Sequence, residues 1–254
     1  NGFAAGVGAL QYNENTVHVT IAPGAAIGAP ASAVLTPAGS HLDLDNQITT
    51  AEAGAVPSIA ARRLPGSNRL ELRGSIPLVS EPFARVVSVN NPTLFFVTAL
   101  RNALTAHGID VRGAAVDVDD LRDAPSPAGG TLLVIHHSPP LSELATRLMK
   151  DSVNLYAETL LKTIGATSGA ATFEGGRTAA AVTLQPWGVV PAGVVQVDGS
   201  GLSRYNYVTP DSLVTVLMHV DRDDGMREPF EGSLPIAGRD GTLAARMKGT
   251  AAEG

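Results

Sequence analysis

The sequence contains no cysteine and only three lysines among its 254 residues. The absence of cysteine excludes disulfide scaffolds, thiolate zinc sites, iron–sulfur clusters and cysteine nucleophiles. A chain without cysteine suits export, but many cytosolic chains also lack this residue, so the composition alone does not establish a compartment.

The sequence also has no excess of positively charged residues. The formal net charge is −6 and the isoelectric point is about 5.5, which argues against a nucleic-acid partner because phosphate binding requires a basic surface. No stretch approaches the roughly 18 apolar residues of a membrane-spanning helix, so we expect no transmembrane segment. The chain does not begin with Met, and both ends interrupt apparent structure; we expect a processed chain or a fragment.

Signatures of metal and cofactor sites are also lacking. His136 and His137 are adjacent at the end of a predicted strand, where neighbouring side chains face opposite ways, and neither belongs to an H-E-x-x-H pattern. The acidic groups at 43–47 and 117–123 do not match a calcium loop. No phosphate-binding loop, dinucleotide-binding loop or G-x-S-x-G elbow is present. The sequence therefore predicts no metal and no cofactor.

What is present divides into two parts. The first ~120 residues predict mainly strands, with one helix capped by Asn91 and ended by Gly108. The segment 123–130 is rich in proline and glycine and predicts a linker, so we place the boundary there, between domains 1–125 and 126–254. The predicted strands are 7–12, 16–21, 42–45, 69–73 and 84–89, and residues 13–15 are expected to form a hairpin turn between the first two.

The second part predicts an α/β arrangement that is mostly helical. Residues 131–135 are apolar and β-branched, which favours a strand. Helical spacing of apolar residues follows Pro140, and a second helix is expected from about Ser152 to Gly165. A third helix is expected to begin at Thr209, a good cap.

The pattern that carries chemistry is Ser152-Val153-Asn154. Alone it is uninformative, because serine and asparagine are common helix caps. Its setting at 149–158 resembles the second active-site motif of the class C low-molecular-mass penicillin-binding proteins, the D-Ala-D-Ala carboxypeptidases and endopeptidases of bacterial peptidoglycan. Four further segments resemble this family in the same order and extend the resemblance over essentially the whole chain: 7–15, 91–109, 198–204 and 234–243.

This resemblance implies an α/β (α+β) fold class: the mostly helical part of a penicillin-binding, β-lactamase-like transpeptidase domain, plus a β-rich inserted domain. It also implies acyl transfer, in which a serine attacks the D-Ala-D-Ala carbonyl, a lysine takes its proton and water then releases the acyl group. Ser152 would relay a proton toward the leaving amine, and Asn154 would hold the substrate amide.

The other two motifs of the family are absent. An S-x-x-K requires serine three positions before lysine, and those positions hold Arg147, Thr159 and Ala245. No K-T-G occurs either; Lys248-Gly249-Thr250 has a different order and is interpreted as structural. We expect the nucleophile and the third motif to lie outside these residues, so that this chain alone is inactive.

The block 198–204 supplies the remaining candidates, with Ser200 and Gly201 expected to line the substrate site. Arg204 has two interpretations: it binds a substrate carboxylate, which an arginine holds bidentately, or it forms an ion pair that stabilises the glycine-rich loop. Lys150 is interpreted as a solvated residue at a helix end, and Asp198 as a turn former.

The main hypothesis is therefore a serine-type D-Ala-D-Ala carboxypeptidase or endopeptidase of the periplasm or cell exterior, whose partners are peptidoglycan peptides and β-lactams. The alternative is a non-catalytic peptidoglycan-binding or structural module with a degenerate cleft. A Ser-His-Asp hydrolase is disfavoured because no elbow places a serine beside a histidine. The oligomeric state and the preference between carboxypeptidase and endopeptidase stay open.

Overall fold

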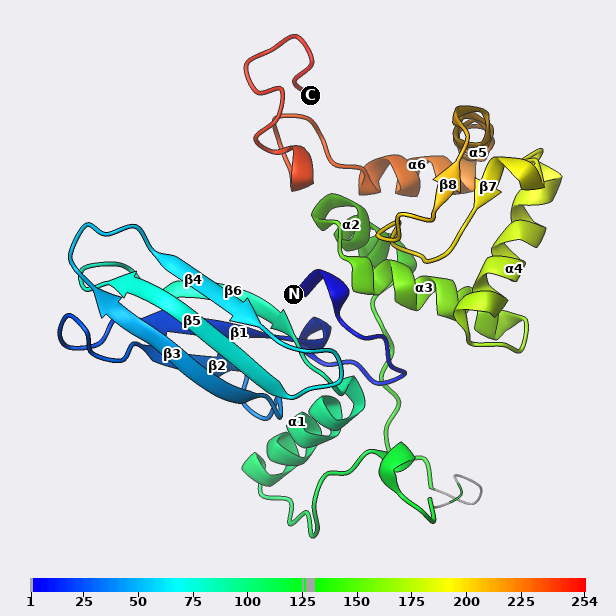
Figure 1. Ribbon diagram of the computed structural model, residues 1–254. Coiled ribbons are helices and arrows are strands. Elements are labelled where there is room, and N and C mark those ends of the chain that lie inside the picture. The colour runs from blue at the N-terminus through cyan, green and yellow to red at the C-terminus, as the bar shows by residue number, and fades with distance from the viewer. Residues whose placement is uncertain (1, 125, 127–130) are drawn as a thin grey trace. The chain divides into compact units, whose positions relative to one another are not determined.

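The computed structural model describes residues 2–124, 126 and 131–254. The chain forms two compact units, residues 1–129 and 130–254. The predicted linker at 123–130 lies largely outside the described residues, as does the predicted boundary at residue 125. The elements of the strand-rich half and of the helix-rich half are nevertheless each described (Figure 1).

The described part of unit 1 contains two three-stranded sheets, one α-helix and short 3-10 helices (Figure 1). The first sheet is antiparallel with the order β2-β1-β6, and the second has the order β3-β5-β4, with β3 parallel and β4 antiparallel to β5. The strands are β1 Thr16–Ala22, β2 Ser32–Thr36, β3 Asp43–Ala51, β4 Ser58–Arg62, β5 Arg69–Pro77 and β6 Phe83–Ser88.

The core of unit 1 lies between the two sheets and follows from alternation along their strands. In β1, Val17, Val19 and Ile21 are fully buried, whereas the intervening His18 is exposed. One apolar cluster contains these residues together with Ile48 and other buried side chains of the second sheet. Because successive side chains of a strand face opposite ways, this alternation places one face of each sheet against the shared core.

Helix α1, Pro92–Ala106, covers this core through Phe95, which is fully buried. The predicted start of the helix is confirmed: the Asn91 side chain accepts a hydrogen bond of 2.8 Å from the backbone N–H of Leu94, and Pro92 occupies the first turn. The Tyr12 ring meets Phe95 edge-on, with 5.1 Å between ring centroids. The aromatic pair fixes the N-terminal segment to the helix.

The predicted strand at 7–12 and the hairpin turn at 13–15 are wrong. Residues 7–12 form bends and irregular structure, and Asn13–Asn15 form a short 3-10 helix with positive φ angles. The buried Asn15 holds this segment by bonding the backbone of Gly6 and Tyr12. The physical reason is that β2 and β6 already occupy both edges of β1, so no edge remains for a strand formed by residues 7–12.

Unit 2 is mainly helical, as the sequence predicts. Its helices are α2 Leu141–Asp151, α3 Asn154–Thr167, α4 Phe173–Leu184, α5 Pro210–Arg222 and α6 Asp224–Ser233. A small antiparallel pair joins β7 Val194–Val195 to β8 Tyr207–Val208. Thr209 caps α5 as expected, since its hydroxyl accepts a hydrogen bond from the Ser212 N–H.

Two details of unit 2 differ from the sequence prediction. Gly165 does not end α3, which continues to Thr167; a Cβ atom at this position would lie 2.6 Å from the Gly176 nitrogen, so the glycine permits close packing of α3 on α4. Residues 131–135 do not form a strand, because no described strand pairs with them. The side chains of Leu132, Leu133 and Val134 are instead strongly exposed.

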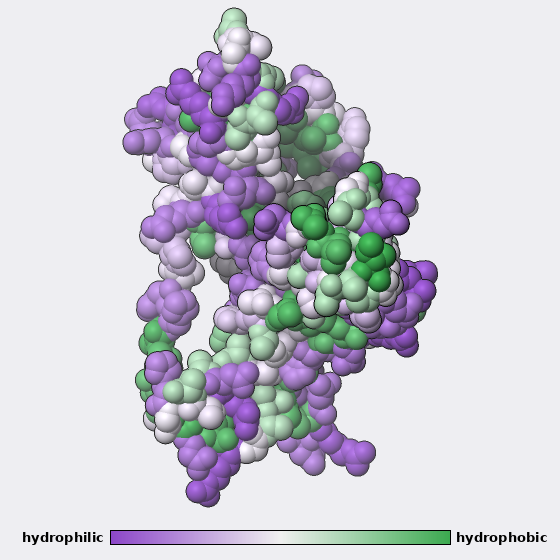
Figure 2. All heavy atoms as spheres, turned by 90° about the vertical axis from the view of Figure 1, so that its left-hand side faces the viewer, coloured by the Kyte–Doolittle hydropathy of each residue, from purple (hydrophilic) through white to green (hydrophobic). Residues whose placement is uncertain are grey.

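Figure 2 shows one face of the molecule, where hydrophobic side chains interrupt a mainly hydrophilic surface. None of the helices in the described part of the chain combines the length and the apolar character needed to cross a bilayer.

The fold predicts a large cost for truncating Phe95. Phe95→Ala should lower the free energy of unfolding of unit 1 by about 3–5 kcal/mol, since the substitution removes a fully buried ring and leaves a cavity. Phe83→Ala is the matched control, because Phe83 is 37% exposed, and it should cost clearly less. Urea titration followed through amide NMR signals of residues 16–106 measures both. Equal costs would contradict the assignment of Phe95 to the core.

Candidate active-site corner

The S-x-N pattern occupies the junction of two helices. α2 ends at Asp151 and α3 begins at Asn154, so Ser152 and Val153 form the turn between them. Ser152 is exposed and has left-handed backbone angles, with φ 57° and ψ 49°. Left-handed angles are uncommon for a residue other than glycine, and such residues occur often at functional sites.

Glu158 connects this junction to the loop at 197–206. It lies one helical turn after Asn154, so the two residues share a face of α3. The Glu158 carboxylate accepts three hydrogen bonds: 2.9 Å from the Gly199 N–H, 3.1 Å from the Ser200 N–H and 2.5 Å from the Ser200 hydroxyl. The structure therefore brings the S-x-N helix and the candidate Ser200 together.

Gly199 allows the loop to approach α3 this closely. A Cβ atom at residue 199 would lie 2.3 Å from the carbonyl oxygen of Ala157, a separation that real Cβ atoms do not show. Gly201, the other candidate of this block, is exposed and has a φ of 76°, which glycine adopts without strain. The glycines of the block therefore serve packing and turning of the backbone.

The loop is held from within by Asp198 and Asn206. One oxygen of the Asp198 carboxylate accepts from the Gly201 N–H at 2.8 Å and the Asn206 amide at 2.7 Å, and the other accepts from the Ser203 N–H at 2.7 Å. The Asn206 carbonyl accepts from the Val197 N–H at 2.8 Å. The interpretation of Asp198 as a turn former is confirmed.

Arg204 does not stabilise this loop through an ion pair with any described residue. The side chain is exposed, and its guanidinium carbon lies 5.9 Å from the centroid of the Tyr205 ring. The ion-pair interpretation is therefore wrong for the described part of the chain. The interpretation as a carboxylate-binding cation stays a prediction.

A second contact fixes the other side of the junction. The Lys150 ammonium group, near the end of α2, forms an ion pair with Asp240 from the block 234–243. The hydrogen bond from Lys150, followed by the 2.7 Å bond from the Ile236 N–H, lowers the pKa of Asp240 below its usual value. At pH values above the ordinary aspartate pKa, this pair stabilises the fold. The stabilisation is lost as the pH falls through the lowered pKa of Asp240. Lys150 is only 20% exposed, so its interpretation as a solvated residue is wrong.

Glu158, Asn206 and Asp240 received no role from the sequence. Each has at least one polar partner that lies between 8 and 90 positions away, and spacing along the chain does not reveal such contacts. One usable signal was the i, i+4 spacing of Asn154 and Glu158 on a predicted helix. No cluster of metal-ligating side chains occurs within the residues that the structure describes.

Known proteins are similar to this chain over most of its length. The model of the D-Ala-D-Ala carboxypeptidase 3 (S13) family matches residues 1–254. A D-alanyl-D-alanine carboxypeptidase of Actinomadura sp. (strain R39) is 36% identical over 256 residues, which cover 96% of this chain and 46% of that protein. The D-alanyl-D-alanine carboxypeptidase DacB of Haemophilus influenzae is 30% identical over 182 residues, which cover 71% and 36%. This chain thus spans less than half the length of these curated relatives.

Solved structures show the same fold. The crystal structure of penicillin binding protein 4 (dacB) from Haemophilus influenzae aligns with a TM-score of 0.79 and 24% identity, over 96% of this chain and 53% of that one. The same protein complexed with a β-lactam aligns with a TM-score of 0.73 and 25% identity, over 95% and 55%. The chain therefore shares its mixed α/β architecture with penicillin binding protein 4 from Haemophilus influenzae.

The hydrogen bonds that Glu158 accepts from Gly199 and Ser200 predict how a substitution at Glu158 changes the stability of the loop at 197–206. Glu158→Gln leaves an amide that cannot accept hydrogen bonds through both of its polar atoms, so one loop N–H loses its acceptor. We expect hydrogen exchange of the Gly199 and Ser200 amides to accelerate about tenfold, which corresponds to roughly 1.4 kcal/mol of local opening.

Glu143→Gln is the matched control, because Glu143 is exposed in the first turn of α2. It should leave exchange at 199 and 200 unchanged. Unaltered exchange in Glu158→Gln would show that the carboxylate does not hold the loop.

Proposed function

This chain belongs to the D-Ala-D-Ala carboxypeptidase 3 (S13) family, and from this premise we propose that it contributes the S-x-N part of a serine-type D-Ala-D-Ala carboxypeptidase or endopeptidase site. The proposed substrates are peptidoglycan stem peptides, which would react through an acyl-enzyme. The single observation that supports this most is the set of three hydrogen bonds that Glu158 accepts from Gly199 and Ser200, which joins the S-x-N helix to the block 198–204.

In this proposal, residues 126–254 are the mostly helical part of a transpeptidase-like domain, and residues 1–125 are a β-rich inserted domain. The family comparison and the helical content of unit 2 support the first assignment, and the two three-stranded sheets support the second. The inferred location is the periplasm or the cell exterior.

Ser152 and Asn154 have separate roles in the proposed mechanism. The Ser152 hydroxyl both donates and accepts hydrogen bonds, so it can relay a proton to the amine of D-Ala as the peptide bond breaks. The Asn154 side chain offers a carbonyl and an NH₂ group that can align the substrate amide. Such positioning is effective because it removes the entropic cost of orienting the substrate during reaction.

The block 198–204 completes the proposed binding groups. Arg204 is exposed and forms no ion pair with a described residue, so its guanidinium group is available to a substrate carboxylate. The Ser200 hydroxyl is occupied by Glu158, which favours a role in shaping the site over direct attack on substrate. Gly201 would line the site with backbone alone.

The nucleophile is not among these residues, since no lysine in the sequence follows a serine by three positions. This absence is the observation that favours the alternative, a non-catalytic peptidoglycan-binding or structural module. The two functions differ in whether a longer chain that contains these residues also carries Ser-x-x-Lys and Lys-Thr-Gly and forms an acyl-enzyme.

The 254 residues alone should form no covalent adduct with a penicillin. Acylation needs a serine whose proton a neighbouring base accepts, and Leu155 stands three positions after Ser152. Incubation with a labelled penicillin and intact-mass analysis measures this. A stoichiometric mass increase would place a nucleophile within these residues, and Ser152→Ala and Ser200→Ala would then identify it.

A longer chain that supplies the two missing motifs should be acylated, and Ser152→Ala in that chain should lower kcat for a D-Ala-D-Ala peptide about 100-fold or more, because proton transfer contributes that much. Ser168→Ala is the control, since Ser168 is exposed at the end of α3 and should leave kcat unchanged. Full activity in the Ser152 variant would overturn its assigned role.

A further inference from the structure

A small cleft lies at the end of the second sheet of unit 1, where a turn joins β4 to β5. Its volume is about 220 Å³, and it is lined by Arg62, Arg63, Leu64, Ser67, Arg69 and Glu71. This volume is below the range of sites that enclose drug-sized ligands, so the cleft suits an end group rather than a whole glycopeptide. Three arginines face one glutamate there, in a chain whose net charge is −6.

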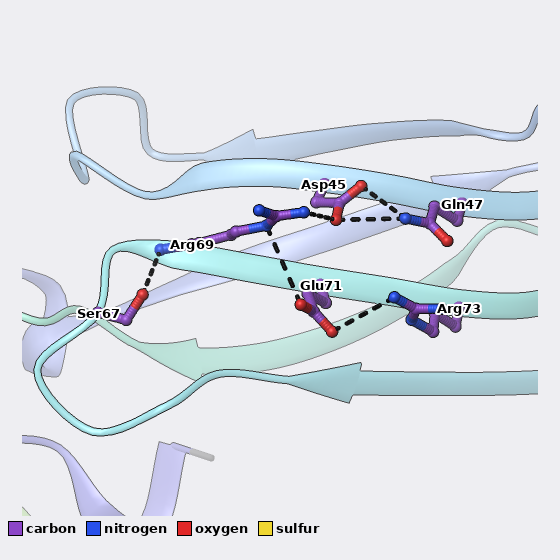
Figure 3. Close-up of polar contacts among 6 residues, drawn as sticks. All are labelled: Asp45, Gln47, Ser67, Arg69, Glu71 and Arg73. Carbon is purple, nitrogen blue, oxygen red and sulfur yellow. Dashed lines mark hydrogen bonds and ion pairs between the residues drawn. The ribbon is translucent and has the colours of Figure 1, made fainter.

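The acidic side chains near the cleft already have cationic partners, as Figure 3 shows. Arg69 donates a 2.6 Å hydrogen bond to Asp45 on the neighbouring strand β3, and its guanidinium group lies 4.0 Å from Glu71. Glu71 also faces Arg73 at 3.7 Å. Asp45 and Glu71 therefore contact Arg69 and Arg73. Arg62 stands opposite Glu71 in the sheet register, but no described carboxylate lies within ion-pair distance of Arg62 or Arg63.

Arg63 is partly buried, and none of the carboxylates in the described part of the chain forms an ion pair with it. Its guanidinium group donates 2.8 Å and 3.0 Å hydrogen bonds to the carbonyl oxygen and the hydroxyl of Ser88 on β6, both neutral acceptors. Burial lowers the pKa of Arg63, the response expected of a cation that lacks a counter-charge. Arg62, next to it, is exposed, and its guanidinium group has no hydrogen-bond or ion-pair partner among the described residues.

Two further groups of the lining limit what the cleft can bind. Leu64 is 62% exposed and places an apolar surface beside the cations. The Ser67 hydroxyl accepts a 3.1 Å hydrogen bond from the Arg69 N–H and keeps its own hydrogen for donation. Arginine cations, a hydroxyl donor and a small apolar surface match a carboxylate that carries a methyl group.

We propose that this cleft binds the C-terminal carboxylate of a peptide ending in alanine, with Arg62 and Arg63 as the recognising cations. A guanidinium group matches a carboxylate through two parallel hydrogen bonds, and the ligand would supply the missing counter-charge. The peptide class rests on the proposed function, because stem peptides of peptidoglycan end in D-Ala. The cleft belongs to unit 1, whereas Ser152 and Asn154 belong to unit 2.

The test uses the isotopically labelled 254-residue chain and three probes: N-acetyl-D-Ala-D-Ala, the same dipeptide with an amidated C-terminus, and inorganic phosphate. Amide NMR titration at low salt should show shifts at residues 62–71 with the free dipeptide and not with the amide. Arg62→Gln should weaken this binding about fivefold, the effect of one ion pair near a surface. Arg85→Gln, which removes an exposed arginine from the other sheet, is the matched control and should bind like the unaltered chain.

The outcomes separate this proposal from the proposed function. Shifts confined to residues 150–206 would overturn the cleft and leave the S-x-N assignment intact. Equal shifts at 62–71 with the amidated peptide, or unchanged binding in Arg62→Gln, would also overturn it. Shifts at 62–71 with phosphate but not with the dipeptide would show that the cleft takes a different oxyanion. Dipeptide binding that depends on Arg62 supports the cleft even if a longer chain is not acylated.

Discussion

The carboxylate of Glu158 accepts hydrogen bonds from residues 41 and 42 positions further along the chain, and this contact joins helix α3 to the loop at 197–206. A partly buried carboxylate is stable only when its oxygens have donors, and here two backbone N–H groups and one hydroxyl provide them. The same bonds satisfy two backbone N–H groups of a glycine-containing loop. Helix and loop therefore stabilise each other.

Further polar contacts hold the loop at 197–206 and the end of α2 in place. Asp198 and Asn206 close the loop on itself, and Arg177 on α4 donates to the Val197 carbonyl oxygen at 3.0 Å. The ion pair of Lys150 and Asp240 fixes the end of α2 against the block 234–243. Ser152, with its left-handed backbone angles, lies between Lys150 and Glu158 along the chain.

Local rules predicted a large part of the fold. The β-rich run at 16–21 identified β1, and the cap at Asn91 identified the start of α1, because both signals depend only on neighbouring residues. The strand expected at 7–12 fails because the edges of β1 are occupied, a property of the whole sheet. For the site, the motif located Ser152 and Asn154, whereas Glu158 became visible only through its contacts with a distant loop.

The central claim is that Ser152 and Asn154, with the loop held by Glu158, form one wall of a site for D-Ala-D-Ala peptides and β-lactams. The most direct measurement is a crystal structure of a longer, acylated chain with a bound β-lactam. The account predicts the Asn154 side chain within hydrogen-bond distance of the ligand amide, about 3 Å, and the Ser200 to Arg204 segment beside the ligand. A β-lactam bound elsewhere, with no contact to Asn154, would contradict it.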